Sequence, residues 1–339
     1  MIVQPGQSGS CIPVSDLLIG LLGVLLATNQ TSAASNLVQK TTGLAVKIPA
    51  VNDPVEKQYL KLLEDDNVAQ EEVDKWIRDN EAFAKKGAGL PSATLSLRIE
   101  QRFTPVRKAY EQFLLQHPEH ARARLAFGSF LNDLHEEDAA IQQWEKAREL
   151  DAKNPAAWNN LANYYGHCGQ LKKAFAYYAK AIELNPNESV YYHNFGTTVY
   201  LFRKDAKDYY QINEQQVFDR ALGLYAQALK LDPKNFPLAT DVAQTYYGIK
   251  PVRHEAAITA WQYALSVAND DIEREGVYMH LARFEMNAGH FDEARKQLGR
   301  VTQTMYDELK TRLLRVLGEK EAQAKDATQN APAANKDGK

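Results

Sequence analysis

Large apolar residues between positions 158 and 187 recur three and four positions apart, with small residues between them. Residues at this spacing lie on one face of an α-helix, so Leu161 and Tyr165 are expected to share a face. The segment Gly-His-Cys-Gly at 166–169 interrupts the pattern midway, and Pro186 cannot continue a helix. The stretch therefore predicts two short antiparallel helices, whose aromatic residues pack as core and do not line a cofactor site.

The same pattern returns with a period of about 34 residues. Gly128, Ala162 and Gly196 are small residues at this spacing, each inside a helical pattern. Two antiparallel helices approach closely only where side chains are small, so a small residue is needed once in each unit. Four further pairs of positions share the spacing: Ala140 and Ala174, Trp144 and Tyr178, Ala147 and Ala181, and Ala152 and Pro186. Self-similarity with a fixed period of this length indicates a helix–turn–helix repeat.

The unit at 158–187 resembles the tetratricopeptide repeat family. The residues that carry the resemblance are Trp158, Leu161, Ala162, Tyr165, Ala174, Tyr178 and Pro186. Ala162 stands where the family usually has glycine, and Tyr178 where it usually has phenylalanine; both fit the same packing role. The resemblance covers about residues 92–304. It implies an all-α fold, an α-solenoid in which about five helix pairs form a right-handed superhelix with extra helices at both ends.

The register of the array is interrupted. The interval from Ala174 to Ala221 exceeds one period by thirteen, so thirteen residues are inserted near 202–216. Because the repeat resumes in register at Ala221, we expect the insert to leave the array and to pack on a neighbouring repeat or on a partner. Upstream, residues 94–103 are predicted as a degenerate first helix, followed by a second helix that ends at Pro118.

Helical segments flank the array at both ends. In the N-terminal helical region, residues 35–91, Asp53 and Pro54 form a helix start, with a capping side chain and proline at the first helical position. An apolar stripe follows, formed by Val73, Trp76, Ile77 and Phe83. Residues 305–325 are predicted as a capping helix that presents one apolar face, formed by Met305, Leu309, Leu313 and Leu317. The tail at 326–339 has no apolar residues able to form a core, and it is predicted to be disordered.

An eleven-residue apolar run, LLIGLLGVLLA at 17–27, lies near the N-terminus. It is too short to span a bilayer as a helix but suits the apolar core of a signal peptide. Ser32 and Ala34 supply small residues for cleavage after Ala34, so residues 1–34 are predicted to be a signal peptide of an exported or periplasmic protein. Against this, no Lys or Arg precedes the run, and Asp16 adjoins it. The alternative is a buried or interfacial N-terminal helix in a cytoplasmic protein.

Charge and cysteine content exclude several classes of function. The formal net charge of -3 gives no excess of positive potential, so nucleic acid is not an expected partner. Cys11 and Cys168 are the only two cysteines, which is too few for a disulfide framework. Nothing beside Cys168 in the sequence indicates a thiol nucleophile.

Motifs for catalysis and metal binding are also missing from the sequence. His135 and His254 each begin like the zinc motif H-E-x-x-H, but Ala139 and Ile258 occupy the second ligand position. No P-loop, G-x-S-x-G motif or strand-based G-x-G-x-x-G occurs. We therefore expect no enzymatic activity, no metal site and no cofactor.

In the family that the chain resembles, the first helix of each repeat lines a concave groove. Carried over to this sequence, the groove is expected to contain Asn159, Asn160, Asn163, His193, Asn194, Thr197, Asp241, Gln244 and Arg283, with further inward positions at Arg122, Asn132, Asp133, His280 and Asn287. Asn160 and Asn194 are one period apart and occupy the same repeat position. Amides both donate and accept hydrogen bonds, so these two residues could pair with the main chain of an extended peptide. The alternative is that they are solvated surface.

Two functions from different classes remain. The first is an interaction scaffold that binds a protein or an extended peptide in the groove. The second is a structural or assembly subunit of a larger complex that docks through the insert and the N-terminal helices. An enzyme of unrecognised type is a distant third. No stable membrane span is expected, and the sequence does not indicate an oligomeric state.

Overall fold

The computed structural model describes residues 53–329. This part of the chain contains fourteen α-helices, α3 to α16, and one short 3-10 helix, and it contains no β-strand. The all-α fold predicted from the sequence is confirmed. The signal peptide predicted at 1–34 and the end of the predicted tail, 330–339, lie outside the described residues.

The chain divides into two compact units, one ending at Asn194 and the other beginning at Phe195. The boundary falls within helix α9 (Ser189–Leu201), so the start of this helix belongs to the first unit and its end to the second. Each unit is described by itself below.

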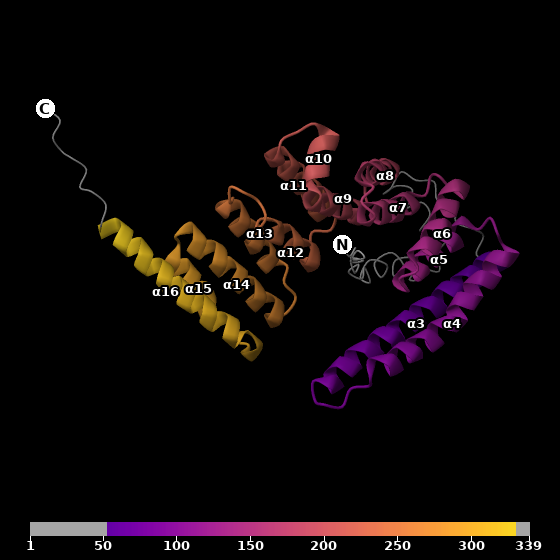
Figure 1. Cartoon of the computed structure of the whole chain (residues 1–339), viewed down its shortest axis with the longest axis horizontal. Coiled ribbons are helices and arrows are strands. Elements are labelled where there is room, and N and C mark those ends of the chain that lie inside the picture. The colour runs from indigo at the N-terminus through magenta and orange to yellow at the C-terminus, as the bar shows by residue number, and fades with distance from the viewer. Residues whose placement is uncertain (1–52, 330–339) are drawn as a thin grey trace, which may run out of the picture. The chain divides into compact units, whose positions relative to one another are not determined.

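The first unit begins with a long helical hairpin, in which α3 and α4 lie side by side (Figure 1). The start of α3 follows the sequence prediction: the Asp53 side chain accepts a hydrogen bond from the Val55 N–H at 2.9 Å, and Pro54 is the first helical residue. At the far end, the Asn80 side chain holds the turn by accepting from the Leu90 N–H at 2.6 Å. The hairpin consists of α3 (Pro54–Ala84) and α4 (Ser92–Gln116).

The base of the hairpin is fastened to the first helix pair. The Tyr59 hydroxyl donates to the Arg122 carbonyl oxygen at 3.4 Å, and the Arg122 guanidinium pairs with Glu56 at 2.7 Å. Arg107 forms a second ion pair with Glu136, at the start of the helix that follows. Arg122, predicted to face the groove, therefore holds the hairpin in place.

One prediction for this region is wrong, and the predicted apolar stripe is only partly buried. Residues 94–116 form one continuous helix, not a degenerate pair, because no turn residue separates the two apolar patterns and Pro105 is accommodated inside α4. The predicted apolar stripe is buried only at Val73; Ile77 is 36% exposed and Phe83 is 55% exposed. These positions lie in the distal part of the hairpin, where α4 is the only described helix beside α3.

Two helix pairs complete the first unit. Gly128 lies so close to the Trp144 indole that a Cβ at this position would be 2.5 Å from its Cδ1 and Nε1 atoms, which explains why glycine is needed there. In the next pair the equivalent position is Ala162, which is fully buried. The pairs are α5 (Ala121–Asp133) with α6 (Glu137–Leu150), and α7 (Pro155–His167) with α8 (Leu171–Leu184).

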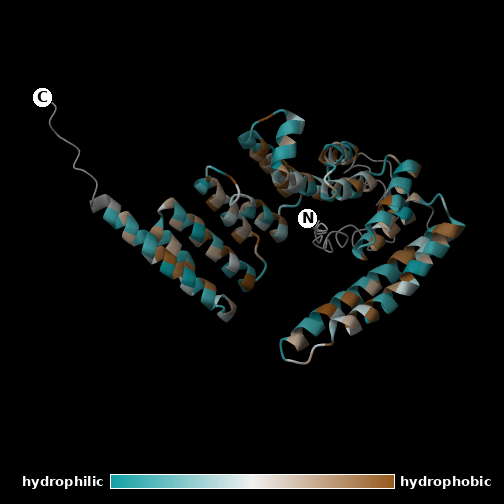
Figure 2. Cartoon of the chain, viewed as in Figure 1, coloured by the Kyte–Doolittle hydropathy of each residue, from teal (hydrophilic) through white to brown (hydrophobic). Residues whose placement is uncertain are grey.

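The second unit contains three more pairs, so the predicted number of five is confirmed. Trp261, Leu281 and Phe284 are almost completely buried in its main core. Brown, hydrophobic stretches alternate with teal, hydrophilic ones along its helices in Figure 2. The pairs are the end of α9 with α11 (Glu214–Leu231), α12 (Phe236–Thr245) with α13 (His254–Ser266), and α14 (Asp271–Ala288) with α15 (Phe291–Gly299).

The thirteen-residue insert forms a helix of its own, α10 (Arg203–Tyr210), which packs on α11. Ala206 is fully buried there, and the Arg220 guanidinium lies 3.8 Å above the Tyr210 ring. A capping box at Asn213 and Gln216 then starts α11. The insert therefore packs on the second helix of the pair that it interrupts.

The C-terminal helix α16 (Asp307–Gln329) packs on α14 and α15 through Leu313 and Leu317, which are buried as predicted. Met305 does not share this face: it is 65% exposed and belongs to the short 3-10 helix Thr304–Tyr306. The reason is the preceding turn, where the Glu275 carboxylate accepts from the backbone N–H groups of Thr302 and Gln303 at 2.8 and 2.7 Å.

Helix α16 also runs to Gln329, into the segment predicted to be disordered. Alanine, glutamine, lysine and glutamate dominate its last turns, and these residues favour helix even without a core to pack on.

Candidate functional site

The second helix of each of the first three pairs carries one buried aromatic residue whose polar atom reaches the first helix of the same pair. The Trp144 indole N–H donates to the Leu125 carbonyl oxygen at 3.2 Å. In the next pair the Tyr178 hydroxyl donates to Oδ1 of Asn163 at 2.6 Å. These contacts satisfy polar atoms that burial would otherwise leave unpaired.

The third pair repeats this arrangement with a different acceptor. The hydroxyl groups of Tyr225 and Thr197 lie 3.0 Å apart, and Thr197 follows Asn163 by one period of the repeat. Burial raises the pKa of Tyr225 to about 12, so the phenol stays protonated over the physiological range. Asn163 and Thr197, both predicted to line the groove, thus each pair with a core tyrosine.

Three of the other predicted residues of the first unit, Asn159, Asn160 and Asn194, form a continuous chain of hydrogen bonds with Ser129. Nδ2 of Asn194 donates to Oδ1 of Asn159 at 3.2 Å. Nδ2 of Asn159 donates to Oδ1 of Asn160 at 3.4 Å, and Nδ2 of Asn160 donates to Oγ of Ser129 at 3.3 Å. This amide chain, Asn194–Asn159–Asn160–Ser129, connects the first helices of three successive pairs: α9, α7 and α5.

Burial differs along the amide chain. Asn159 is only 5% exposed, whereas Asn160 and Asn194 are half-buried and reach the surface. None of the four side chains carries a charge. Each amide has two N–H donors and an oxygen with two lone pairs, so Asn160 can contact both its neighbours and a further polar group.

Ser129 was missed by the sequence analysis, although a signal existed. It stands one period before Asn163, at the same repeat position. The Tyr178 hydroxyl donates to the Asn163 side chain, so this side chain already has a partner. Trp144 instead donates to the backbone carbonyl of Leu125, so the Ser129 hydroxyl can accept a hydrogen bond from Asn160. His193, also predicted for the groove, lies half-buried beside Asn194 in α9.

In the second unit Tyr247 and His280 lie together, and the charge of Arg283 acts to lower the pKa of both. The Tyr247 hydroxyl lies 2.9 Å from Nδ1 of His280, whose ring stacks on the Trp261 indole with centroids 4.0 Å apart and planes 2° from parallel. Burial, with the nearby Arg283 charge, lowers the pKa of His280 to about 4, so the ring is neutral at physiological pH.

The other predicted residues of this unit, Asp241 and Gln244, are exposed on α12. Tyr247 was missed by the sequence analysis. It follows Gln244 by three residues, the spacing at which helical side chains become neighbours, although α12 itself ends at Thr245.

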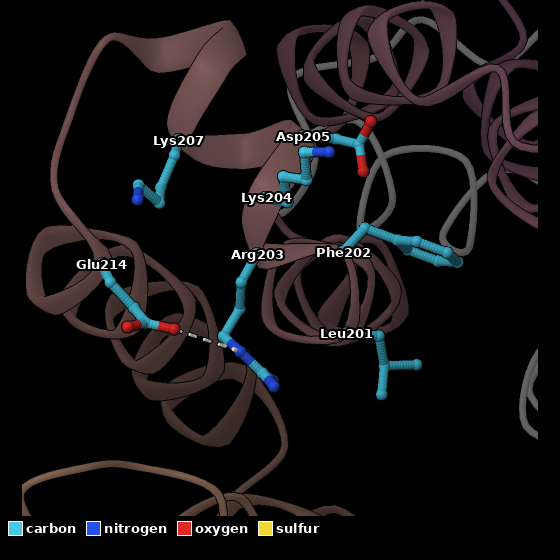
Figure 3. Close-up of a pocket in the computed structure, with 7 residues that line it drawn as sticks. All are labelled: Leu201, Phe202, Arg203, Lys204, Asp205, Lys207 and Glu214. Carbon is cyan, nitrogen blue, oxygen red and sulfur yellow. Dashed lines mark ion pairs between the residues drawn. The ribbon is translucent and has the colours of Figure 1, made fainter.

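A hollow of about 370 Å³ lies beside the insert. Figure 3 shows the residues that line it. Arg203 pairs with Glu214 across it at 3.7 Å, so part of its charge is already compensated. Its walls come from Leu201, Phe202, Arg203, Lys204, Asp205, Lys207 and Glu214. These residue types do not form a catalytic set.

Neither metal binding nor membrane spanning has support in the described part of the chain. No group of three or more His, Cys, Asp or Glu side chains between residues 53 and 329 is placed to hold a metal ion. Nδ1 of His120 instead accepts from the Ala123 N–H at 3.0 Å and caps α5. Within the same residues, none of the helices combines the length and the apolar character needed to cross a bilayer.

The model of the tetratricopeptide repeat family matches residues 155–188, which span α7, α8 and the turn after them. This match and the five helix pairs of the described residues support a tetratricopeptide repeat protein. Such repeats generally serve protein–protein interaction and are not themselves enzymatic. No curated protein matches the sequence.

Several solved structures are similar to this chain. YrrB, a tetratricopeptide repeat protein with an unusual peptide-binding site, is 15% identical, with 62% of this chain and 98% of that chain covered and a TM-score of 0.46. Pseudomonas aeruginosa pilF is 15% identical, with 73% and 98% covered and a TM-score of 0.48. TTC0263 from Thermus thermophilus is 19% identical, with 60% and 99% covered and a TM-score of 0.40.

Proposed function

We propose that this protein is an interaction scaffold that binds an extended segment of a partner protein on the first-helix face of its first unit. The amide chain Asn194–Asn159–Asn160–Ser129 is the observation that supports this proposal. It places uncharged donors and acceptors side by side on three neighbouring helices. An extended peptide presents N–H and C=O groups along its length, so the two sets of groups are complementary.

The lack of charge in the amide chain defines the kind of recognition. Contacts to the peptide main chain are independent of side-chain identity, so this face would accept segments of varied sequence. Each net hydrogen bond contributes about 0.5–1.5 kcal/mol, and a buried peptide group left unpaired costs about 1–3 kcal/mol. Asn160 and Asn194 are the best placed to make such contacts, because both are half-buried at the same repeat position.

The test is capture of partners from an extract of the native host, followed by mass spectrometry. Replacing Asn160 and Asn194 together with alanine should weaken capture about tenfold or more, since about 1.4 kcal/mol corresponds to a factor of ten. The double variant also loses hydrogen bonds within the amide chain, so its folding must be compared by circular dichroism.

Asn163→Ala is the matched control, because it removes an amide from the same helix but breaks only the bond to Tyr178. It should lose stability and keep capture. Equal capture by the folded double variant and the wild type would show the amide chain to be solvated surface and move the binding site elsewhere.

A second candidate function is that of an assembly subunit. Three large apolar side chains in the distal part of the α3–α4 hairpin favour it: Ile77, Phe83 and Leu97 are 36%, 55% and 54% exposed. Native mass spectrometry discriminates between the two functions, because an assembly subunit purifies as a stable complex and a peptide scaffold as a monomer that captures peptides.

Export is a separate proposal that depends on the sequence of residues 1–34 alone. If these residues are a signal peptide, the intact mass of the protein from its native host should correspond to a chain that begins at Ser35. A cytosolic protein that retains Met1 would contradict export and favour the cytoplasmic alternative.

A further inference from the structure

The imidazole of His120 lies where three helices meet. It is the N-cap of α5, and its Nδ1 atom accepts a hydrogen bond from the Ala123 N–H at 3.0 Å. The same ring contacts both helices of the hairpin: its centroid is 4.7 Å from that of Tyr59 in α3 and 5.1 Å from that of Phe113 in α4. One side chain thus closes the first turn of α5 and packs against the base of the hairpin.

This cap requires an uncharged ring. A neutral imidazole accepts at Nδ1 only when its proton is on Nε2, and a protonated imidazole has a donor at both nitrogens. Ala123 is fully buried, so water does not reach its N–H while the turn keeps this structure. A buried N–H without an acceptor is costly and rare. Proton uptake by His120 therefore opposes the closed first turn of α5.

The charged groups that face this ring come from α3, from α5 and from the turn between α4 and α5. Arg122 of α5 and Glu56 of α3 already form an ion pair at 2.7 Å, so the carboxylate has a partner. His117, in the turn, adds a like charge when it is protonated. The Tyr59 phenol stays neutral, because burial raises its pKa to about 12. Burial and then the Arg122 charge lower the pKa of His120 from its ordinary value of 6.5, against an opposing effect of Glu56.

The contacts between the start of α3 and the start of α5, here called the joint, depend on this turn. The Tyr59 hydroxyl donates to the carbonyl oxygen of Arg122 at 3.4 Å, and Arg122 follows His120 by two residues. Opening of the turn displaces this carbonyl and so weakens the joint. Further along the hairpin the Tyr110 and Phe127 rings stack at 5.1 Å and keep α4 on α5, so the opening is local.

We propose that His120 is an acid-sensitive latch, which holds the joint closed when its ring is neutral and opens it when the ring takes up a proton. The inference goes beyond the proposed function. It concerns neither the ligand of the amide chain nor the partner in an assembly, so failure of either proposal leaves it unaffected.

The pH range of the latch follows from the sign of the shift. Below pH 6.5 the open joint binds a proton that the closed joint excludes. The stability of the closed joint is therefore fully present above pH 6.5 and is lost as the pH falls through the lowered pKa of His120.

The first test is amide hydrogen exchange of the full chain at pH 7 and pH 5. Rates are expressed as protection factors, which removes the intrinsic effect of pH on exchange. Protection of residues 123–127 should fall about fivefold or more at pH 5, since an N-cap has an effect of this size. Helix α8, in the same unit, is the internal reference and should change less than twofold.

The second test is the distance across the joint. Spin labels are attached at Gln58 in α3 and Lys146 in α6, both exposed, in a chain whose Cys11 and Cys168 are changed to serine. The mean distance between the labels should increase from pH 7 to pH 5, with the same midpoint as the loss of protection. That midpoint should lie below pH 6.5.

Two variants separate the cap from the ring contacts. His120→Asn keeps a capping acceptor that cannot titrate, so its protection and label distance should be the same at both pH values. His120→Phe keeps an aromatic ring without an acceptor, so at pH 7 it should already resemble the wild type at pH 5. His117→Asn is the matched control, because the same substitution three residues earlier leaves the cap in place and should keep the wild-type response. Circular dichroism must show all three to be folded.

Three results would overturn the proposal. The first is a wild-type protein whose protection at residues 123–127 is the same at pH 7 and pH 5. The second is a His120→Asn variant that keeps the wild-type response, which would assign the pH dependence to other groups. The third is a loss of protection with no change in label distance, because the cap would then open without opening the joint.

Discussion

The hydroxyl of Tyr178 donates a hydrogen bond to Oδ1 of Asn163 at 2.6 Å. One repeat further along the chain, the same contact recurs between Tyr225 and Thr197. A position that the sequence assigns to partner binding thus also keeps a buried phenol satisfied. Substitutions there change stability, and this change must be separated from any effect on binding in every experiment on this face.

Asn163→Ala should lower the free energy of unfolding by about 1–3 kcal/mol, because it leaves the buried Tyr178 hydroxyl without its acceptor. Urea denaturation followed by circular dichroism measures the loss. Tyr178→Phe removes the hydroxyl itself, so adding Asn163→Ala to that variant should cost much less than it costs in the wild type. Equal costs in both backgrounds would mean that the contact contributes nothing to stability.

Gly128→Ala and Gly223→Ala should have opposite effects on stability. A Cβ at position 128 meets the Trp144 indole at 2.5 Å, so Gly128→Ala is expected to destabilise by about 1–3 kcal/mol. Position 223 is exposed in α11 with no atom within 4 Å of an added Cβ. Alanine there should stabilise the protein by about 0.5–1 kcal/mol, since glycine is unfavourable inside a helix. Thermal melts of the two variants check the sign of each effect.

His280 should make stability fall as the pH falls. Its pKa is about 4 in the folded protein against 6.5 for the ordinary side chain. Between these values the unfolded chain binds a proton that the folded chain excludes, so the stabilisation present above pH 6.5 is lost progressively down to pH 4. Going from pH 7 to pH 5, this residue should cost about 1–2 kcal/mol.

His280→Phe keeps an aromatic ring against Trp261 but cannot titrate. The difference in urea midpoint between pH 7 and pH 5 should therefore be smaller in this variant than in the wild type. An unchanged difference would show that other groups cause the pH dependence.

Ala206→Glu should release the insert helix α10 from α11. Ala206 is fully buried, and an unpaired charge at such a position is strongly disfavoured. Trypsin should then cut within α10, at Arg203, Lys204 and Lys207, at least tenfold faster. Asp205→Ala, one residue away and exposed, is the control that leaves all three trypsin sites in place. Unchanged cleavage of Ala206→Glu would mean that α10 packs on α11 too weakly to protect it.

The repeat period predicted most of the core because helix packing repeats the same distances in each unit. Small residues at 128, 162 and 196 and the aromatic residues at 144, 178 and 225 all lie where the spacing placed them. The pattern failed where a helix has no neighbour to pack on. Phe83 and Ile77 have the spacing of core residues, but the distal hairpin offers them little to pack against.

The amide chain was only partly predictable, because each of its hydrogen bonds depends on which acceptors are already used by other side chains. Asn160 and Asn194 occupy equivalent positions and yet have different partners, Ser129 and Asn159. The cause is that equivalent positions of the two pairs carry different aromatic residues, Trp144 and Tyr178. The Trp144 indole donates to a backbone carbonyl, whereas the Tyr178 hydroxyl donates to the Asn163 side chain. The repeat period identifies equivalent positions but not the choice of partner at each.

The α3–α4 hairpin has a mechanical consequence. Its attachment to the first helix pair runs from Glu56 and Tyr59 to the contact of the Phe103 and Phe130 rings, which lies near the level of Glu72 because Arg102 pairs with Glu72. Helix α3 continues from there to Ala84, and at 1.5 Å per residue this part is about 18 Å long, so a tilt of about 10° at its base moves the tip by roughly 3 Å. The hairpin is thus a lever arm. A change in the Arg122–Glu56 ion pair could leave the repeats unaltered and still displace the tip of the hairpin. A probe attached at position 83 would detect this displacement.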